Sequence, residues 1–419
     1  MTLYALGAIY AVIFWIIASK HPKIALMLII ATSPFQNDIS GGGPLRFSIA
    51  EVNLLLSVPI LLLKKRRLSL GPFGPAIYFY LLVSLGCTLL SWRSSSPVAL
   101  MQMVVYMVVA VMVFSGLPKS DADFRFALNG LVCVAVVMAC AVIIKRSGFV
   151  WHLHKNGVGA SLGAATIVGT ELWFAATSRK RKRLLFAALG IMAAGLFFTL
   201  SRGAWFGCLV GILILIALRG QFRLLLRVSV VLVPLVAICW AYLPESSREY
   251  STSFSSEGNL NIKLRYDSVD YARNIFLSSP ITGVGVGLRK EYDATNIIWC
   301  TLAETGIVGL IALIVLHVSI LRTAWKIQKN LDRSSTLYSG VALSAALVIS
   351  RFMHGMVDHY WGRGPTTVVW AAVGMALFAY FAKRRYIMMQ RLARYQQAGK
   401  VPTKELNSIM QVANVRFSF

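Results

Sequence analysis

Residues 98–117 read VALMQMVVYMVVAVMVFSGL, a run of twenty residues without one charged side chain. A helix of this length covers about 30 Å at about 1.5 Å per residue, which is the thickness of a bilayer's hydrocarbon core. Comparable apolar runs recur along the chain, in which 57% of 419 residues are hydrophobic. The mean hydropathy of +0.68 is also far above that of a soluble domain. The sequence therefore predicts an all-α, polytopic membrane protein with about 12 to 13 transmembrane helices.

The expected spanning segments follow one another with mostly short connections. They lie near residues 3–19, 23–34, 47–63, 76–92, 98–117, 127–144, 158–177, 184–200, 203–218, 224–243, 296–321, 335–352 and 365–382. The longest polar stretch, 244–295, contains a helix-like segment at 262–277. We therefore expect N-terminal transmembrane helices in 1–150, a core in 151–382 that includes the polar stretch, and a basic tail in 383–419.

Basic residues outnumber acidic ones by 42 to 16, and they cluster between the apolar runs. If the segments alternate, one set of connections, which includes the tail, carries 28 of the 42 Lys and Arg. The positive-inside rule makes this set cytoplasmic and makes 244–295 and 351–364 extracytoplasmic. We expect a bacterial inner-membrane protein with its active face in the periplasm and a tail that contacts anionic lipids. With no soluble basic surface, nucleic-acid binding is not expected.

Cysteine and histidine spacing does not favour a metal or a disulfide framework. The six cysteines lie in or beside apolar runs and form no CxxC pair, so we expect them to pack as small side chains. Two histidines in 351–364 lack a third ligand at metal spacing. The sequence therefore predicts neither a metal site nor a bound cofactor.

Three arginines are candidates for binding phosphate, because a planar guanidinium can hold two oxygens at once. Arg202 lies between two apolar segments with almost no loop between them, and Arg265 and Arg273 lie two helical turns apart on the expected 262–277 helix. Simpler alternatives remain open. Arg202 could reach the lipid interface as an isolated charge, and the other two could pair with carboxylates on a solvated helix face.

Polar residues in 351–364 form a second candidate group. His354 and Asp358 share a helix face if the helix continues, and Asp358 could also orient the imidazole of His359. The alternative is an interfacial belt, because the loop also carries Tyr, Trp and Arg residues that suit the headgroup level.

Several further residues have both a functional and a structural interpretation. Lys155 could contact a phosphate or be an ordinary interfacial lysine. Glu51 and Glu171 lie in apolar surroundings, and intramembrane carboxylates can mark transport pathways. Glu304 is best interpreted as a hydrogen-bonding partner between helices. These carboxylates keep a transporter in consideration.

Three motifs carry a resemblance to a known family. Thr199–Trp205 (TLSRGAW) resembles the Ser-Arg-Gly signature of the bacterial O-antigen ligase superfamily. LRY at 264–266 and NIFLSSPITGVG at 274–285 resemble that family's arginine helix and Pro-Gly stretch. NIIWCTLAETGIVGL at 296–310 is similar to its stretch His-Asn-x-Tyr-Leu-x-x-Leu-x-Glu-x-Gly-Ile-x-Gly-Leu. The resemblance covers roughly residues 155–320.

The resemblance implies a GT-C type glycosyltransferase that needs no metal. It would transfer a glycan from an undecaprenyl-diphosphate donor on the periplasmic side, with Arg202 and Arg265 as catalytic cations. Further substrate contacts would come from Lys155, Arg273, Asn296 and His354. The acceptor is a further repeat unit in a polymerase, which we favour, or lipid A-core in a ligase. Alternatives are a transporter of lipid-linked glycans, or a non-catalytic member that binds glycolipid among other polysaccharide-assembly proteins.

The chain departs from the family pattern at one position. Thr295 stands where the family has a histidine, and a threonine cannot act as a base near neutral pH. The candidates to replace that histidine are Asp293, two residues upstream, and the Asp358–His359 pair.

Overall fold

The computed structural model describes residues 2–37, 47–64, 68–223, 260–292, 295–329 and 331–397, with a few single positions between 224 and 259. The helices in these ranges are α1 (Thr2–Lys20), α2 (Pro22–Thr32), α3 (Ile49–Leu63), η1 (Gly71–Phe73), α4 (Gly74–Leu90), α5 (Ser96–Val104), η2 (Val105–Ala110), α6 (Val111–Gly116), α7 (Asp121–Lys145), α8 (Lys155–Ala175), α9 (Arg179–Phe198), α10 (Arg202–Arg219), α13 (Leu260–Ser278), α14 (Leu288–Glu291), α15 (Ile297–Gln328), α16 (Thr336–Gly355) and α17 (Pro365–Gln397). The described ranges contain no β-strand beyond one isolated bridge.

Eight stretches of the described chain are helical, long and apolar enough to cross a membrane, and three shorter apolar helices accompany them. The helical membrane fold predicted from the sequence is therefore confirmed. The expected segment at 224–243 lies mostly outside the described residues. The expected 262–277 helix is present as α13. The chain continues from the last span into the tail without a break, because α17 runs on to Gln397.

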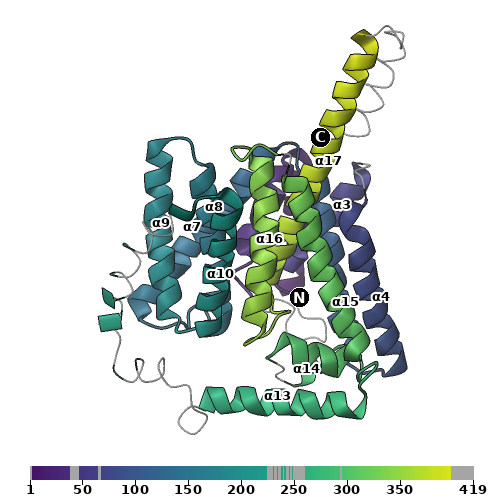
Figure 1. The fold of residues 1–419 in the computed structure, drawn as a ribbon. Coiled ribbons are helices and arrows are strands. Elements are labelled where there is room, and N and C mark those ends of the chain that lie inside the picture. Colours follow the sequence, from purple (N-terminus) through teal and green to yellow (C-terminus); the bar gives the residue numbers. More distant parts are fainter. Residues whose placement is uncertain are drawn as a thin grey trace.

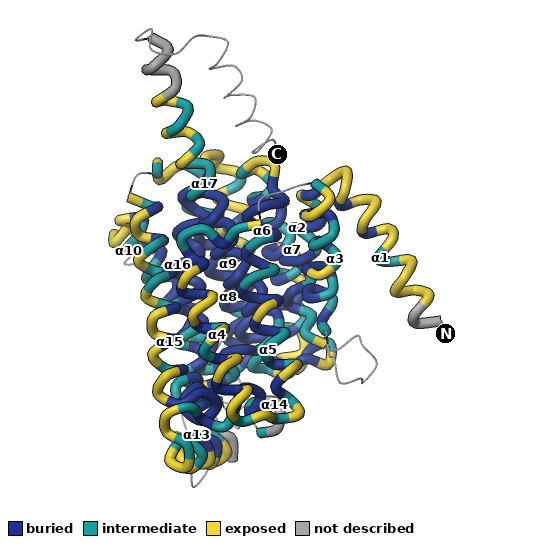
Figure 2. Tube along the Cα trace, turned by 90° about the vertical axis from the view of Figure 1, so that its right-hand side faces the viewer, coloured by how far each residue is buried: buried dark blue, intermediate teal, exposed yellow. Residues whose placement is uncertain are grey.

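The spanning helices form one bundle, and α13 lies across one end of it (Figure 1). The dark blue tube in Figure 2 shows that buried residues fill the middle of the bundle and exposed ones its outside. α17 leaves the bundle at the end opposite to α13 (Figure 1). The described part of the basic tail, residues 383–397, and the 262–277 helix thus lie at opposite ends, as the alternation of segments requires.

Small residues allow α8 to lie close against α10. A side chain at Gly159 would meet the Ala204 side chain at 3.0 Å, and one at Gly163 would meet Cys208 at 3.4 Å. Such four-residue spacing of small residues is a common way for membrane helices to approach, since packing rather than hydrophobicity drives their association. The contact brings the start of α10, with the Ser-Arg-Gly motif, beside the start of α8.

The segment 98–117 is helical throughout but is not an α-helix throughout. Val105–Ala110 form a π-helical turn between α5 and α6. Tyr106 in this turn donates a hydrogen bond to the carboxylate of Glu51, which also closes a capping box with Ser48 at the start of α3. These local partners account for the burial of Glu51.

Glu171 also has a partner, which is Arg219 at the end of α10. The Arg219 guanidinium donates to both carboxylate oxygens of Glu171, one of them from Nε at 3.3 Å, and to the Ser339 hydroxyl at 3.2 Å. Both charged side chains are almost fully buried. Arg219 thus satisfies a buried carboxylate 48 residues earlier in the chain.

α15 contains one break, at Gly306. Its backbone angles, φ 63° and ψ −162°, are accessible essentially only to glycine. The break releases the carbonyls of Ala303 and Glu304, which accept hydrogen bonds from the amides of Val284 and Gly285 at 2.9 Å. The loop 280–287 is thus bound to the first turns of α15. Broken helices are tolerated at membrane depth where other protein groups satisfy the backbone in this way.

We expect Gly306→Ala to lower the free energy of unfolding by at least about 1–3 kcal/mol, because it forces alanine into this region of backbone space. The new methyl group would also collide with the Ile281 carbonyl. Thermal unfolding in detergent measures the change. Gly190→Ala is the matched control: it lies within α9 with open space around it, so it should stabilise by about 0.5–1 kcal/mol. A Gly306→Ala protein as stable as wild type would contradict the proposed role of the break.

Candidate functional site

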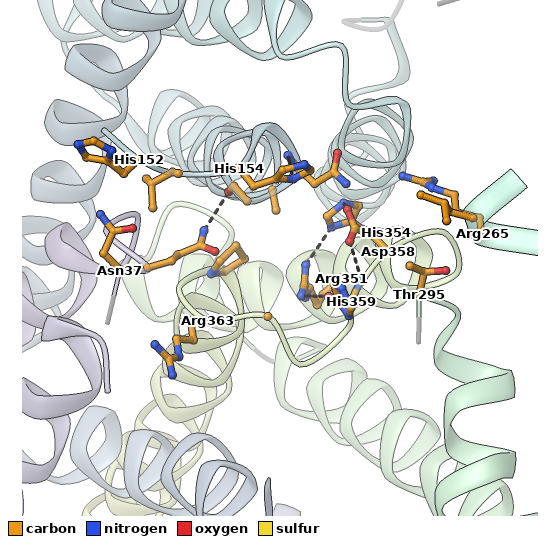
Figure 3. Close-up of a pocket in the computed structure, with 18 residues that line it drawn as sticks. Asn37, His152, His154, Arg265, Thr295, Arg351, His354, Asp358, His359 and Arg363 are labelled. Carbon is orange, nitrogen blue, oxygen red and sulfur yellow. Dashed lines mark hydrogen bonds and ion pairs between the residues drawn. The ribbon is translucent and has the colours of Figure 1, made fainter. Parts of the chain in front are cut away.

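A cavity of about 500 Å³ opens at the end of the bundle where α13 lies. Figure 3 shows side chains from α13, from the connection between α16 and α17 and from the start of α8 around it. Its polar lining comprises Gln36, Asn37, His152, His154, Asn156, Arg265, Thr295, Arg351, His354, Asp358, His359 and Arg363. The volume lies within the range of about 300–1,000 Å³ that is usual for ligand pockets.

Four of the site residues predicted from the sequence line this cavity: Arg265, His354, Asp358 and His359. Thr295, at the position of the family histidine, lines it as well, and its backbone amide donates to the Ser268 hydroxyl of α13 at 3.2 Å. The structure thus brings together residues up to 94 positions apart in the chain (265 to 359).

Arg202, Arg273 and Lys155 are not among the residues that line the cavity. Arg273 is exposed on α13, and Lys155 is the first residue of α8. Arg202 begins α10 and is half-buried, and a side chain at the adjacent Gly203 would lie 3.0 Å from the His354 ring. Substrate contacts by these three residues stay predictions, and Asp293 lies outside the described residues.

The Asn296 side chain positions the site through hydrogen bonds to backbone groups. Its side-chain oxygen accepts hydrogen bonds from the amides of Ile298 and Trp299 and so caps α15. Its amide nitrogen donates to the Met356 carbonyl at 2.9 Å. Asn296 therefore ties the start of α15 to the loop after α16, and its predicted contact with substrate stays a prediction.

Arg351 organises the cavity wall, and the sequence analysis did not single it out. This buried guanidinium donates to the carbonyls of Tyr360 and His359 and to Nδ1 of His354, the last at 2.9 Å. Two of its nitrogens therefore hold the loop after α16, and the third holds the His354 ring at the end of α16. The available signal was its place inside an expected spanning segment, where an arginine needs a polar partner.

The bond from Arg351 fixes the proton on His354. A guanidinium only donates, so Nδ1 must accept and the neutral ring carries its hydrogen on Nε2. Nε2 lies 3.6 Å from Oδ2 of Asp358, too far for a hydrogen bond. Both atoms are buried, and neither has a hydrogen-bond partner among the residues that the structure describes. A substrate hydroxyl placed beside this pair could accept from Nε2 and donate to Oδ2.

Asp358 remains ionised in this environment. Burial would raise its pKa, but the adjacent His354 ring and His359, whose amide donates to Oδ1 at 2.7 Å, hold the pKa well below its usual value. The cavity is therefore lined both by a buried carboxylate, that of Asp358, and by the guanidinium of Arg265 (Figure 3). Such a set of groups can remove a proton at one point and stabilise negative charge at another.

The sequence from 187 to 314 matches the family model for O-antigen ligase. This part of the chain is similar to the O-antigen ligase family. The resemblance of the three motifs is thereby confirmed, and it supports a role of O-antigen ligase or polymerase type in polysaccharide biosynthesis. No curated protein matches the chain.

The region that matches the O-antigen ligase model supplies Arg265 and Thr295, whereas Arg351, His354 and Asp358 lie beyond it. The family match therefore carries no information on this second group. Only the fold shows that both groups line one cavity.

The structure also shows the state of the cysteines and the arrangement of potential metal ligands. The five described cysteines are free thiols, and Cys239 lies outside the described residues. Among the residues that the structure describes, no three His, Cys, Asp or Glu side chains are arranged to hold a metal ion.

Proposed function

We propose that the protein is a glycosyltransferase of the bacterial inner membrane that acts in surface polysaccharide or lipopolysaccharide biosynthesis. It transfers a glycan from an undecaprenyl-diphosphate donor to a sugar acceptor at the periplasmic face. The observation that carries the proposal is one cavity, lined by Arg265 from the family region and by Asp358, at the end of the bundle opposite the basic tail.

The proposed reaction is a single inverting displacement that needs no metal. The acceptor oxygen forms a bond to the anomeric carbon, while the bond from that carbon to the diphosphate oxygen breaks and its electron pair leaves with the diphosphate. Arg265 stabilises the growing charge on the diphosphate. Asp358 takes the acceptor proton in place of the family histidine, whose position is Thr295.

A carboxylate with a low pKa is a weak base, yet it suffices if the proton moves late. Glycosyl transfer passes through an oxocarbenium-like transition state. As the new bond forms, the acceptor oxygen becomes positively charged and its proton becomes strongly acidic. The acceptor hydroxyl would lie beside Asp358 Oδ2 and His354 Nε2 during this step, within hydrogen-bond distance of both atoms.

Within this class we favour a repeat-unit polymerase over a ligase to lipid A-core. The ligase activity depends on the family histidine, and this chain has threonine there. The transporter alternative loses its main support, because Glu51 and Glu171 both have hydrogen-bond partners within the protein that account for their burial.

We expect Arg265→Ala to reduce transfer by about 10²–10³-fold, the usual effect of removing one donor that stabilises a developing oxyanion. The assay measures chain extension from a lipid-diphosphate-linked repeat unit in proteoliposomes. Lys263→Ala is the matched control, since this exposed lysine precedes Arg265 on α13 and does not line the cavity. Equal rates for the two variants would overturn the assignment of Arg265 and weaken the proposed function with it.

A further inference from the structure

A second, smaller cavity of about 230 Å³ lies beside the first. Its lining consists of Arg289, Ile297, Cys300, His359, Tyr360, Trp361, Gly362 and Arg363. His359, Gly362 and Arg363 also line the larger cavity, so the segment 359–363 forms the wall between the two. The smaller volume suits one substituent or sugar unit rather than a whole chain.

The glycine-rich loop before α14 carries Arg289 into this cavity. Gly287 has a φ of 118° and its backbone lies against Ser95 and Ser96, where a side chain would not fit. One oxygen of Glu304 accepts from the amides of Gly287 and Arg289, and the other accepts from Nη1 of Arg289 at 2.8 Å. The Glu304 carboxylate thus fixes both the backbone and the side chain of Arg289.

One edge of the Arg289 guanidinium, formed by Nε and Nη2, does not bind Glu304. Nε and Nη2 are fully buried and have no hydrogen-bond partner among the described residues, and the whole side chain is only 6% exposed. These two nitrogens form the side of a guanidinium that binds two oxygens of one oxyanion in parallel. Leaving buried charged donors unsatisfied is costly, so such an edge indicates a ligand.

Aromatic rings complete the pocket. The guanidinium carbon of Arg289 lies 5.4 Å from the centre of the Trp361 ring, which stacks against Tyr80 at 6.1 Å. The ring holds the guanidinium plane in position and also offers an apolar wall of the kind against which a sugar ring packs.

We propose that this pocket binds the carboxylate of an acidic sugar in the glycan substrate, through the Nε and Nη2 edge of Arg289. The inference rests on the proposed function for the identity of the substrate. Glu304 already balances the charge of Arg289, which favours a singly charged carboxylate over a diphosphate. The wall at 359–363 also separates this pocket from Arg265, the residue assigned to the diphosphate.

Binding to the full-length protein in nanodiscs tests the proposal without requiring turnover. The probes are an oligosaccharide that contains glucuronic acid and its methyl ester, which has nearly the same size but no charge. Wild type should bind the acid about tenfold to a hundredfold more tightly, the range expected for a charged bidentate pair. Equal affinities of wild type for the two probes would overturn the proposal before any variant is made.

Arg289→Lys is the first variant, because lysine can keep the ion pair with Glu304 but cannot present two parallel donors. It should lose the preference for the acid and keep the wild-type affinity for the ester. Arg289→Gln, compared at equal thermal stability, should behave in the same way. A preference that survives both substitutions would overturn the role of Arg289.

Undecaprenyl diphosphate without a glycan is the third probe. If Arg289→Lys weakens its binding and the acid and the ester bind alike, the pocket belongs to the lipid donor and the proposal fails. Arg265→Ala separates this test from the proposed function. It should reduce transfer by about 10²–10³-fold and leave the preference for the acid unchanged, so the two proposals can fail independently.

Discussion

Asp358→Asn is expected to slow glycan transfer by about 10²–10⁴-fold, the usual contribution of a general base. The loss should fall mainly on kcat, because a base acts in the transition state and not in donor binding. Asparagine keeps the size of the side chain and an oxygen that can accept from the His359 amide, so the loop after α16 should stay in place. Single-turnover transfer from a lipid-diphosphate donor, with donor binding measured separately, distinguishes the two steps.

Asp332→Asn is the control for this experiment, because Asp332 is exposed in the connection between α15 and α16 and bonds only locally to Ser334. It should transfer at the wild-type rate. If Asp358→Asn stays within about threefold of wild type, below the range for a base, proton removal belongs to His359 or Asp293 instead.

The same assignment determines the pH dependence of wild type. The pKa of Asp358 lies below the ordinary aspartate value of about 3.9, so this carboxylate is ionised from about pH 5 upward. Lowering the pH from 8 to 5 should therefore leave the transfer rate unchanged as far as it depends on Asp358. A fall in kcat with a midpoint near about 6.5 would identify a histidine as the base.

Breaking the buried pair between Glu171 and Arg219 should have the largest effect on stability. Glu171→Leu alone leaves the Arg219 guanidinium buried without its carboxylate, and removal of one partner from such a pair costs about 3–5 kcal/mol. The double variant Glu171→Leu with Arg219→Leu removes both charges and should recover most of this loss. Reversible unfolding in mixed micelles gives the free energies. A single variant as stable as the double would show that the pair contributes little.

Much of the helical architecture could be predicted because apolar length is a local property of the sequence. The residues 98–117 and 262–277 are helical as expected, and Glu304 serves as a hydrogen-bonding partner. Its partner is Arg289 in the short helix α14 rather than a residue of another spanning helix, which hydropathy could not reveal. The division of the chain at residues 150 and 382 stays a prediction.

The site was less predictable because its geometry depends on contacts between distant segments. Arg265 and the 351–364 residues were candidates separately, but nothing in their spacing placed them around one cavity. The sequence did not single out Arg351 and Arg289, because their importance depends on which of their guanidinium nitrogens have hydrogen-bond partners. Such information exists only once the loops are folded against the helices.

The length of α17 indicates how deep in the bilayer the larger cavity lies. Eighteen residues separate Pro365, which lines the larger cavity, from Lys383, the first residue of the basic tail. At about 1.5 Å per residue this is about 27 Å, close to the thickness of the hydrocarbon core. With Lys383 among the headgroups of one leaflet, the cavity lies level with the headgroups of the other. The diphosphate of the proposed polyprenyl-linked donor would lie at that same level, so this donor would reach the cavity by lateral diffusion without its tail entering water.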